Sequence, residues 1–290
     1  MSQLTLFECE SEDKPINVAT VPMRSPFRYP GGKTWFVPYV RRWLQSIGRQ
    51  VELIEPFAGG GIVSLTAAFE GLVARTIMVE KDEDVAAVWR TILGQQREWL
   101  VRNIENVKIT HENVRKILKK SPRSLRDRAF GTILRNRLSH GGILAHGAGL
   151  IKNGENGKGL KSRWYVATLR QRILDIGEIK DKIKFIQGDG LEIISKNLER
   201  KKAAFFIDPP YTVAGRRLYK YHEIDHERLF DLAKRIKGYF IMTYDDAEEI
   251  ESLALRNRFE VERVLMKTTH HLRKYEIVVG RDLEWLRQMW

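Results

Sequence analysis

The tetrapeptide Asp208-Pro209-Pro210-Tyr211 combines the residue types best suited to chemistry in this chain, and it directly follows an apolar run at 203–207. The Asp208 carboxylate and the Pro209 carbonyl can each accept one hydrogen bond from a planar amino group. These bonds would draw the nitrogen towards tetrahedral geometry and free its lone pair. Two prolines make the turn rigid, and the Tyr211 ring offers a face for stacking. We therefore predict catalytic roles for Asp208, Pro209, Pro210 and Tyr211; plain loop punctuation would not explain the flanking carboxylate and aromatic ring.

A glycine loop follows another predicted strand, at 51–56. Gly59, Gly60 and Gly61 let the backbone approach a ligand closely, at the edge where open α/β sheets bind cofactors. Their spacing is not Gly-x-Gly-x-x-Gly, which argues against a pyrophosphate dinucleotide. Glu80 ends the next predicted strand, about 20 residues further on, where a carboxylate can accept from both hydroxyls of a ribose. We interpret the loop and Glu80 as a cofactor site; a tight turn and an exposed carboxylate are the plain alternatives.

The elements that must position these residues follow an α/β rhythm. Strand, glycine loop, helix and strand succeed one another, which is typical of a parallel sheet covered by helices. Further strands are predicted at 183–187, 203–207 and 239–243, each followed by a helix or turn. A last pair, near 261–266 and 275–279, is separated by a turn and can pair antiparallel. The residues expected to do chemistry therefore follow strands of one sheet.

The charge of the chain is concentrated in its middle. The net charge is +13, and residues 96–174 contain 18 Lys and Arg against 5 Asp and Glu, so the remaining residues are neutral as a group. The segment is predicted to be mostly helical, with a hairpin-like stretch or loop at 151–165. This concentration favours a polyanion-binding surface over an ordinary solvated face. The segment lacks the long amphipathic helix that would indicate a membrane surface.

Composition argues against several other classes of protein. No apolar run approaches the roughly 20 residues that span a bilayer. Residues 1–24 are expected to form a disordered tail, and they lack the features of a signal peptide. Cys9 is the only cysteine, which excludes an internal disulfide or a cysteine-based metal site. His270 and His271 would face opposite sides of a strand, so we predict no metal site. We expect a cytoplasmic protein.

Four stretches, in this order and spacing, resemble the Dam-like (alpha-group) DNA adenine-N6 methyltransferases. The stretch from Phe27 to Lys33 resembles the family's aromatic-x-Gly-Gly-Lys motif, and that from Ile54 to Gly61 its glycine-rich motif. Glu80 falls where the family has an acidic ribose ligand, and the tetrapeptide matches the catalytic motif in full. The resemblance implies a class I S-adenosylmethionine-dependent (Rossmann-like) α/β sheet with an inserted, mostly helical target-recognition domain. It also implies methyl transfer from S-adenosylmethionine to N6 of a flipped adenine in double-stranded DNA.

The resemblance further implies a division of the chain. Residues 25–95 and 175–290 are expected to form the catalytic domain and 96–174 the recognition insert. Asp189, which follows the strand at 183–187, is placed to accept from the cofactor's adenine amino group. The implied contacts to S-adenosylmethionine are Tyr29, Lys33, Glu55, Pro56, Phe57, Gly59, Gly61, Glu80, Asp189 and Asp208.

Contacts to DNA are expected mainly from the basic insert. The stretch Arg135-Asn136-Arg137 resembles an Asn-Arg stretch in the family's recognition segment. Arg216 and Arg217 follow the tetrapeptide among aromatic residues, where a loop can hold phosphates around a flipped nucleotide. The predicted DNA contacts are Arg135, Asn136, Arg137, His140, Lys152, Lys158, Lys161, Arg163, Arg216 and Arg217.

Other functions stay open at this point. The same tetrapeptide geometry suits other planar amino groups: that of adenine in RNA, the N4 amino group of cytosine, or a glutamine amide. A DNA-binding relative without catalytic activity is a further alternative. The expected partners are double-stranded DNA and a cognate restriction endonuclease of the same system, with no membrane. The expected oligomeric state is a monomer or weak dimer, and the recognised sequence is open.

Overall fold

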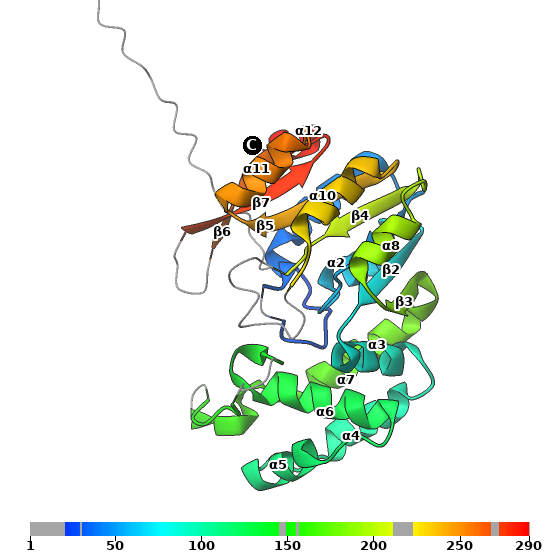
Figure 1. The fold of residues 1–290 in the computed structure, drawn as a ribbon. Coiled ribbons are helices and arrows are strands. Elements are labelled where there is room, and N and C mark those ends of the chain that lie inside the picture. Colours follow the sequence, from blue (N-terminus) through cyan, green and yellow to red (C-terminus); the bar gives the residue numbers. More distant parts are fainter. Residues whose placement is uncertain are drawn as a thin grey trace, which may run out of the picture.

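Within the described residues, seven strands form one sheet in the order β3-β2-β1-β4-β5-β7-β6. The computed structural model describes residues 21–29, 31–144, 149–154, 157–210, 223–267 and 273–289 (Figure 1). The parallel strands are β1 (Glu52–Glu55), β2 (Arg75–Glu80), β3 (Ile183–Gln187), β4 (Ala203–Ile207) and β5 (Tyr239–Asp245). The antiparallel strands are β6 (Glu260–Lys267) and β7 (Arg273–Gly280), and β7 lies between β5 and β6. The predicted α/β sheet and its antiparallel last pair are confirmed.

The central strand β4 shows why this sequence forms such a sheet. All five of its residues are buried, as expected for a parallel strand covered on both faces. Phe205 and Ile207 pack in the core on one face of the sheet, whereas Ala204 and Phe206 pack on the other, because successive side chains point to opposite faces. The strand order matches a dinucleotide-binding sheet except that the antiparallel β7 is inserted beside β5. The predicted class I methyltransferase fold is confirmed.

Helices cover both faces of the sheet (Figure 1). One core contains residues of the 3₁₀ helix η1 (Lys33–Phe36) and of α1 (Val37–Ile47), α2 (Ile62–Phe69) and α12 (Glu284–Arg287). The core on the opposite face contains residues of α8 (Gly190–Lys196), α10 (His226–Arg235) and α11 (Glu248–Arg256). The turns that carry the predicted site therefore rest on a sheet held from both sides.

The basic middle segment forms a group of helices beside β2 and α3 (Glu83–Leu93). The group contains α4 (Arg97–Asn106), α5 (His111–Lys119), α6 (Leu125–Leu138) and α7 (Val166–Glu178), with the 3₁₀ helices η2 (His140–Gly142), η4 (Gly159–Arg163) and η5 (Lys180–Lys182). Its apolar side chains Ile133 and Ile173 share one core with Met78 and Trp89. The proposed boundary at 174 falls inside α7, so the division into a catalytic domain and an insert stays a prediction.

Two local predictions were wrong in the described residues. The predicted tail was placed too far along the chain, because Val21 is buried in the core and the Arg24 guanidinium lies over the Phe69 ring. The hairpin-like interpretation of 151–165 was wrong as well: its described part holds the 3₁₀ helix η4. Gly157 and Gly159 adopt positive φ angles there, which suits turns rather than paired strands.

Among the described residues, no helix has the combination of length and apolar character that crossing a bilayer requires.

Candidate active site

A cavity of about 840 Å³ opens at the carboxyl ends of the parallel strands. Glu55 ends β1, Glu80 ends β2 and Asp208 follows β4, so neighbouring strands bring three carboxylates to one edge. This is the edge at which open α/β sheets bind ligands. All ten residues predicted to contact the cofactor line the cavity, together with Pro209 and Pro210. Tyr211 lies outside the described residues.

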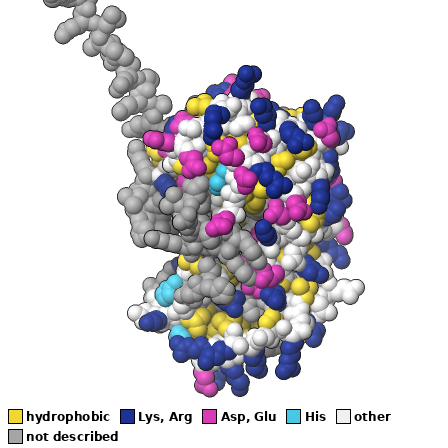
Figure 2. All heavy atoms as spheres, in the orientation of Figure 1, with side chains coloured by type: hydrophobic (Ala, Val, Ile, Leu, Met, Phe, Trp, Pro, Cys, Tyr) yellow, Lys and Arg dark blue, Asp and Glu magenta, His cyan; other side chains and the backbone are white. Residues whose placement is uncertain are grey.

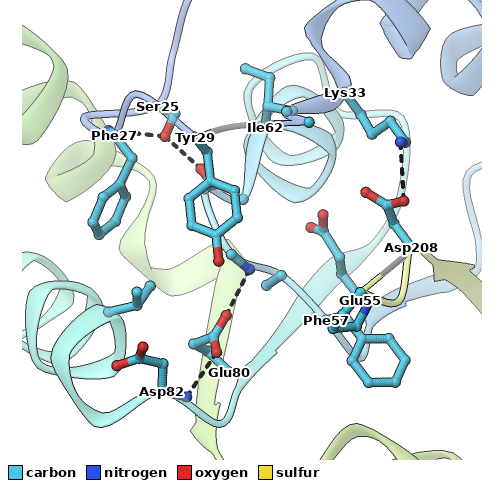
Figure 3. A pocket seen from close by; sticks show the side chains of 18 of the residues that line it. Ser25, Phe27, Tyr29, Lys33, Glu55, Phe57, Ile62, Glu80, Asp82 and Asp208 are labelled. Atoms are coloured by element: carbon cyan, nitrogen blue, oxygen red, sulfur yellow. Dashed lines mark hydrogen bonds and ion pairs between the residues drawn. The ribbon is translucent and has the colours of Figure 1, made fainter. Parts of the chain in front are cut away.

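The glycine loop is packed too tightly for larger residues. Gly59 and Gly61 have φ angles of 46° and 63°. A Cβ on Gly59 would lie 2.6 Å from the Tyr29 ring, and one on Gly60 would lie 3.0 Å from the Tyr29 Cβ. The Trp89 Nε1 donates to the Gly59 carbonyl at 2.9 Å. The aromatic-x-Gly-Gly-Lys stretch and the glycine loop, which are separate in sequence, therefore form one wall (Figure 3).

Glu80 is held by backbone amides on both of its oxygens. Its Oε2 accepts from Gly59 N at 2.9 Å and its Oε1 from Asp82 N at 2.8 Å (Figure 3). Burial raises the pKa of Glu80 to about 7, although these amide bonds oppose the shift. A carboxylate oxygen can accept more than one hydrogen bond, so Glu80 can still receive the hydroxyls of a ribose.

Asp208 shares a buried cation with a second carboxylate. Its Oδ1 accepts from the Thr243 hydroxyl at 2.8 Å and lies 3.1 Å from Lys33 Nζ (Figure 3). The same Nζ lies 2.9 Å from Glu276 Oε2 on β7. Burial raises the pKa of Asp208, opposed mainly by Lys33. For Lys33, burial alone would lower the pKa, but the two carboxylates outweigh it and hold the pKa above its usual value.

Only one oxygen of Asp208 is engaged in this way. No hydrogen bond or ion pair joins Asp208 Oδ2 to any residue of the described chain. Lys33 and Thr243 thus fix the carboxylate through Oδ1. The other oxygen is left to accept from a ligand in the cavity.

Glu55 adds a third carboxyl group to this wall. It is buried, and its Oε2 accepts from Ser64 N at 3.0 Å in the first turn of α2. Burial raises the pKa of Glu55 to about 8, and the nearby charge of Asp208 contributes in the same direction. In Figure 3 its carboxyl group points towards the side of the cavity that holds Asp208.

Asp189 has an evident structural task at the cavity. Its Oδ1 caps α8 by accepting from Leu191 N at 2.9 Å, and its Oδ2 lies 3.0 Å from Lys81 Nζ. Its predicted contact to the cofactor's adenine stays a prediction. Gly190, which the sequence analysis missed, also lines the cavity; a Cβ there would lie 2.6 Å from the Pro56 carbonyl oxygen and 2.7 Å from the Phe57 ring. The Asp-Gly pair after a strand was the available signal.

The predicted DNA contacts fall into different environments. Arg137 is buried and lines the cavity, whereas Arg135 is partly exposed and lies 3.8 Å from Asp84. Arg163 is half-buried. Four further residues are exposed: His140, Lys152, Lys158 and Lys161. Arg216 and Arg217 lie outside the described residues.

The predicted DNA contact of Asn136 is not supported by its position. The side chain is fully buried, its Oδ1 accepts from Arg28 N, and its Nδ2 donates to the carbonyls of Arg28 and Gly142, each at 2.8 Å. The amide therefore ties the N-terminal segment to the end of α6. An Asn-Arg pair in a helix gives no sequence signal that separates such a tie from an exposed contact.

The sequence analysis also missed four residues around the site. Arg28 and Arg172 line the cavity from the helical side, and Glu276 and Thr243 support Lys33 and Asp208. Glu276 had a usable signal, because it directly precedes the apolar run 277–279 of a predicted strand, and a buried carboxylate is uncommon without a partner. Among the described residues, no group of three His, Cys, Asp or Glu is arranged to hold a metal ion. His270 and His271 lie outside them.

Comparison with known proteins agrees with this geometry. A sequence model of the D12 class N6 adenine-specific DNA methyltransferases matches residues 29–269. No curated protein matches the chain in sequence.

Similar solved structures include three methyltransferases. An S-adenosylmethionine-dependent methyltransferase from Agrobacterium tumefaciens has a TM-score of 0.41 and 9% identity, over 86% of this chain and 62% of that one. TrmK of M. capricolum, in complex with S-adenosylhomocysteine, has a TM-score of 0.38 and 5% identity, over 84% and 68%. The m1A22 tRNA methyltransferase TrmK of B. subtilis has a TM-score of 0.35 and 10% identity, over 83% and 64%.

The family match spans most of the chain, from the aromatic residue of the first motif to residue 269, just past the end of β6. It includes the glycine loop, the carboxylate at the end of β2 and the tetrapeptide after β4. The chain therefore belongs to the D12 class N6 adenine-specific DNA methyltransferases, enzymes that transfer a methyl group from S-adenosylmethionine to adenine in DNA.

Proposed function

We propose that the cavity binds S-adenosylmethionine along the glycine loop and receives the target adenine, flipped out of duplex DNA, beside Asp208. The volume of about 840 Å³ lies in the usual range for ligand pockets. The donor set fits the cofactor as well, since Glu80 is preset by Gly59 N and Asp82 N to accept from a ribose. Tyr29, Phe57 and Gly61 supply the close, largely apolar surfaces around it. The bound cofactor supplies an electrophilic methyl group on a sulfonium centre.

The observation that carries the catalytic proposal is the one-sided engagement of Asp208. Its Oδ1 is fixed by Thr243 and Lys33, so Oδ2 keeps its direction without help from the substrate. In our proposal Oδ2 accepts one N6–H bond and the Pro209 carbonyl accepts the other. Both bonds strengthen as positive charge develops on N6, and preset acceptors of this kind stabilise a transition state more than a ground state.

Lys33 has a supporting role in this proposal. Its buried ammonium group offsets the repulsion between the Asp208 and Glu276 carboxylates and favours the ionised form of Asp208. An ionised acceptor makes stronger, charge-assisted hydrogen bonds than a neutral one. The same carboxylate can hold the proton that N6 must lose after methyl transfer. Tyr211 is proposed to stack on the flipped base; this residue lies outside the described part of the chain.

The basic helices are proposed to hold the DNA duplex. Figure 2 shows Lys and Arg side chains with few Asp or Glu among them on the lower part of the displayed face, where the α4–α6 group lies. Over the sheet, Lys and Arg are interspersed with most of the visible Asp and Glu side chains. Exposed Lys152, Lys158 and Lys161 are suited to phosphate contacts, which supply affinity without sequence preference. Action as a monomer or weak dimer stays a prediction. A cognate endonuclease stays a prediction that genomic neighbourhood can test.

Mapping of methylated bases tests the proposal. The chain is expressed in a host without adenine methylation, and N6-methyladenine is then located across the host DNA. We expect methylation at one short, recurring sequence, and strongly reduced methylation with Asp208→Asn. Asp231→Asn, an exposed aspartate on α10, is the matched control and should behave as the wild type. Wild-type levels of methylation by Asp208→Asn would contradict the proposed role of that carboxylate.

A further inference from the structure

Three arginines line the helical side of the same cavity. Arg28 precedes Tyr29, Arg137 lies near the end of α6, and Arg172 lies on α7. All three line the cavity that also holds Glu80 and Asp208. We refer to Arg28, Arg137 and Arg172 as the arginine cluster. Arg137 is 4% exposed, so this is a built site within the wall rather than a surface patch.

The arginine cluster has no acidic partner in the described chain. The Arg137 guanidinium makes no hydrogen bond or ion pair with a described residue, and its Nε is buried. Arg28 Nη1 is buried without a described partner as well. Arg172 Nη1 donates to the Ser25 carbonyl at 3.0 Å. These are neutral or missing contacts, whereas a buried guanidinium usually has a carboxylate beside it.

Other arginines of the same helices are paired in the ordinary way. Arg128 Nη1 lies 2.8 Å from Asp84 Oδ1, and Arg170 Nε lies 3.1 Å from Glu105 Oε1. Arg170 is only two residues from Arg172, on the same helix. Arg126 on α6 also lacks a carboxylate partner among the described residues, but it is exposed and donates to Gln96 Oε1. Burial without a carboxylate therefore distinguishes the cavity wall from the outer surface of the helices.

The electrostatics of Arg137 show how unfavourable this arrangement is without a ligand. Burial, together with the positive charges of Arg172, Arg28 and Arg163, lowers the pKa of Arg137 to about 10. Removing a charge from water without compensation is strongly unfavourable, and like charges nearby add to the effect. An anion that enters the cavity at this wall would remove both penalties together.

The backbone around the arginine cluster is held in place before any ligand arrives. Asn136 joins the backbone of Arg28 to the Gly142 carbonyl, and Arg172 is joined to Ser25. Gly142 has a φ of 76°, and a Cβ there would collide with the Arg28 carbonyl. The two segments that carry the arginines are thus fixed against each other, as a preorganised binding site requires.

We propose that the arginine cluster binds one phosphate of the DNA backbone beside the flipped target nucleotide, and so holds that nucleotide across the cavity from Asp208. This inference rests on the proposed function, and it adds Arg28 and Arg172 to the DNA contacts. Guanidinium groups match the oxygens of a phosphate in geometry and charge, and a phosphate can accept from several of them at once.

The methionine carboxylate of the cofactor is the competing anion for the arginine cluster. A carboxylate and a backbone phosphodiester each carry one negative charge on two oxygens, so the charge of the arginine cluster does not by itself separate the two anions. Arg137 and Arg172 belong to residues 96–174, where the surplus positive charge of the chain lies, together with exposed Lys158 and Lys161. This placement beside other cations of the basic segment favours the phosphate.

A phosphate-removal experiment tests the inference. Duplexes that carry the mapped methylation site are made with a methylphosphonate, which lacks the charge, at each phosphate around the target adenine in turn. We expect one position to weaken DNA binding by wild-type protein by about tenfold, in line with the loss of a charge-assisted hydrogen bond. Arg172→Gln should bind the unmodified duplex about tenfold more weakly and show almost no further loss at that position. Arg170→Gln is the matched control on the same helix and should keep the wild-type response.

Three further results decide the matter. Arg137→Gln should weaken binding of the unmodified duplex and show almost no further loss at the sensitive phosphate, as Arg172→Gln does. If Arg137→Gln lowers the thermal stability too far, the variant at the half-buried Arg172 provides the test. Equal losses at every phosphate for both wild type and variant would overturn the inference. So would weaker binding of S-adenosylmethionine without DNA in Arg172→Gln, which would indicate the carboxylate instead. The readout is binding, so an absence of methylated adenine would refute the proposed function separately.

Discussion

The two walls of the cavity solve the problem of buried charge in opposite ways. On the sheet side, each carboxylate is satisfied by the protein: Glu80 by Gly59 N and Asp82 N, Glu55 by Ser64 N, and Asp208 by Thr243 and Lys33. On the helical side, the arginine cluster has no carboxylate partner in the described chain. The protein itself holds every carboxylate of the first wall, whereas the described chain supplies no carboxylate to the second.

This difference matches the two tasks of the cavity. Catalysis needs acceptors whose directions are fixed before the substrate arrives, and backbone amides and a buried lysine provide that. Holding a polyanion needs cations that gain more from the ligand than from the protein. A cationic sulfonium and a developing positive charge on N6 suit the sheet side with Glu55, Glu80 and Asp208, which we call the carboxylate wall. A phosphate suits the helical side with the arginine cluster, which we call the arginine wall.

The largest expected effect comes from removing the cation of the carboxylate wall. Lys33→Met leaves the buried Asp208 and Glu276 carboxylates without the ammonium group between them. Breaking a buried ion pair in this way typically costs about 3–5 kcal/mol. We expect a loss of that size in the free energy of unfolding, measured by urea denaturation.

A double variant sharpens this result. Lys33→Met with Glu276→Gln should recover part of the lost free energy, because one uncompensated charge is removed together with its partner. The exposed Lys234→Met is the control and should change stability little. Additive losses in the double variant would show that Lys33 and Glu276 are not coupled.

Removal of the Asn136 contacts, which join the segments of Arg28 and Arg137, should have the next largest effect. Asn136→Ala removes three hydrogen bonds to the backbone of Arg28 and Gly142 and leaves buried polar groups unsatisfied. We expect the free energy of unfolding to fall by about 2–3 kcal/mol. DNA binding should weaken as well, since the position of Arg28 depends on this tie. Wild-type stability would show that the contact is dispensable.

The carboxylate wall should also impart a pH dependence to cofactor binding. The pKa of Glu80 is raised to about 7 by burial, so at pH 6 the group is mostly protonated and is a weaker acceptor for ribose hydroxyls. Binding of S-adenosylmethionine, measured by calorimetry without DNA, should therefore be about tenfold tighter at pH 8 than at pH 6. Glu80→Gln should bind more weakly and lose the step near pH 7. An unchanged step would assign it to another group, such as Glu55.

Ionisation of Glu80, which favours cofactor binding, lowers the stability of the folded protein. Its folded pKa lies above the ordinary value of 4.5, so its contribution to stability is largest below about pH 4.5 and is lost as the pH rises through about 7. Tighter cofactor binding and a smaller intrinsic stability should therefore appear over the same pH range. Denaturation without cofactor checks this, and Glu80→Gln should flatten the profile.

The smallest effect is expected at the exposed lysines. Lys158→Gln removes one phosphate contact at most, so DNA binding should weaken only a few-fold and the salt dependence should fall by about one unit of slope. Arg172→Gln, on the arginine wall, should show a larger loss. Equal losses of DNA binding in Lys158→Gln and Arg172→Gln would show that the arginine wall contributes no more than an exposed lysine.

Sequence reasoning found the parts of the site that are local in the chain. The glycine loop, Glu80 and the tetrapeptide each follow a strand, and the ends of parallel strands meet at one edge, so their convergence could be predicted. Contacts between remote elements could not be predicted in this way. The pairing of Lys33 with Glu276 spans 243 residues, and it depends on the register that places β7 beside β5.

Asn136 and Arg137 show a second limit of sequence reasoning. They are neighbours on α6, and both were predicted to bind DNA. The helix turns the Asn136 amide towards the backbone of Arg28 and Gly142, whereas Arg137 lines the cavity. Which neighbour faces which way depends on the packing of α6 on α3, and this helix combines polar and apolar residues without a clear face.

The central claim is that Asp208 activates the amino group while the arginine wall holds the DNA, and single-turnover methyl transfer by Asp208→Asn tests it most directly. With saturating S-adenosylmethionine and the mapped duplex, the account predicts a rate about 10²–10³-fold below wild type, with DNA binding nearly unchanged. Asp231→Asn should react at the wild-type rate. A rate for Asp208→Asn within a few-fold of wild type, on the same duplex, would contradict the account.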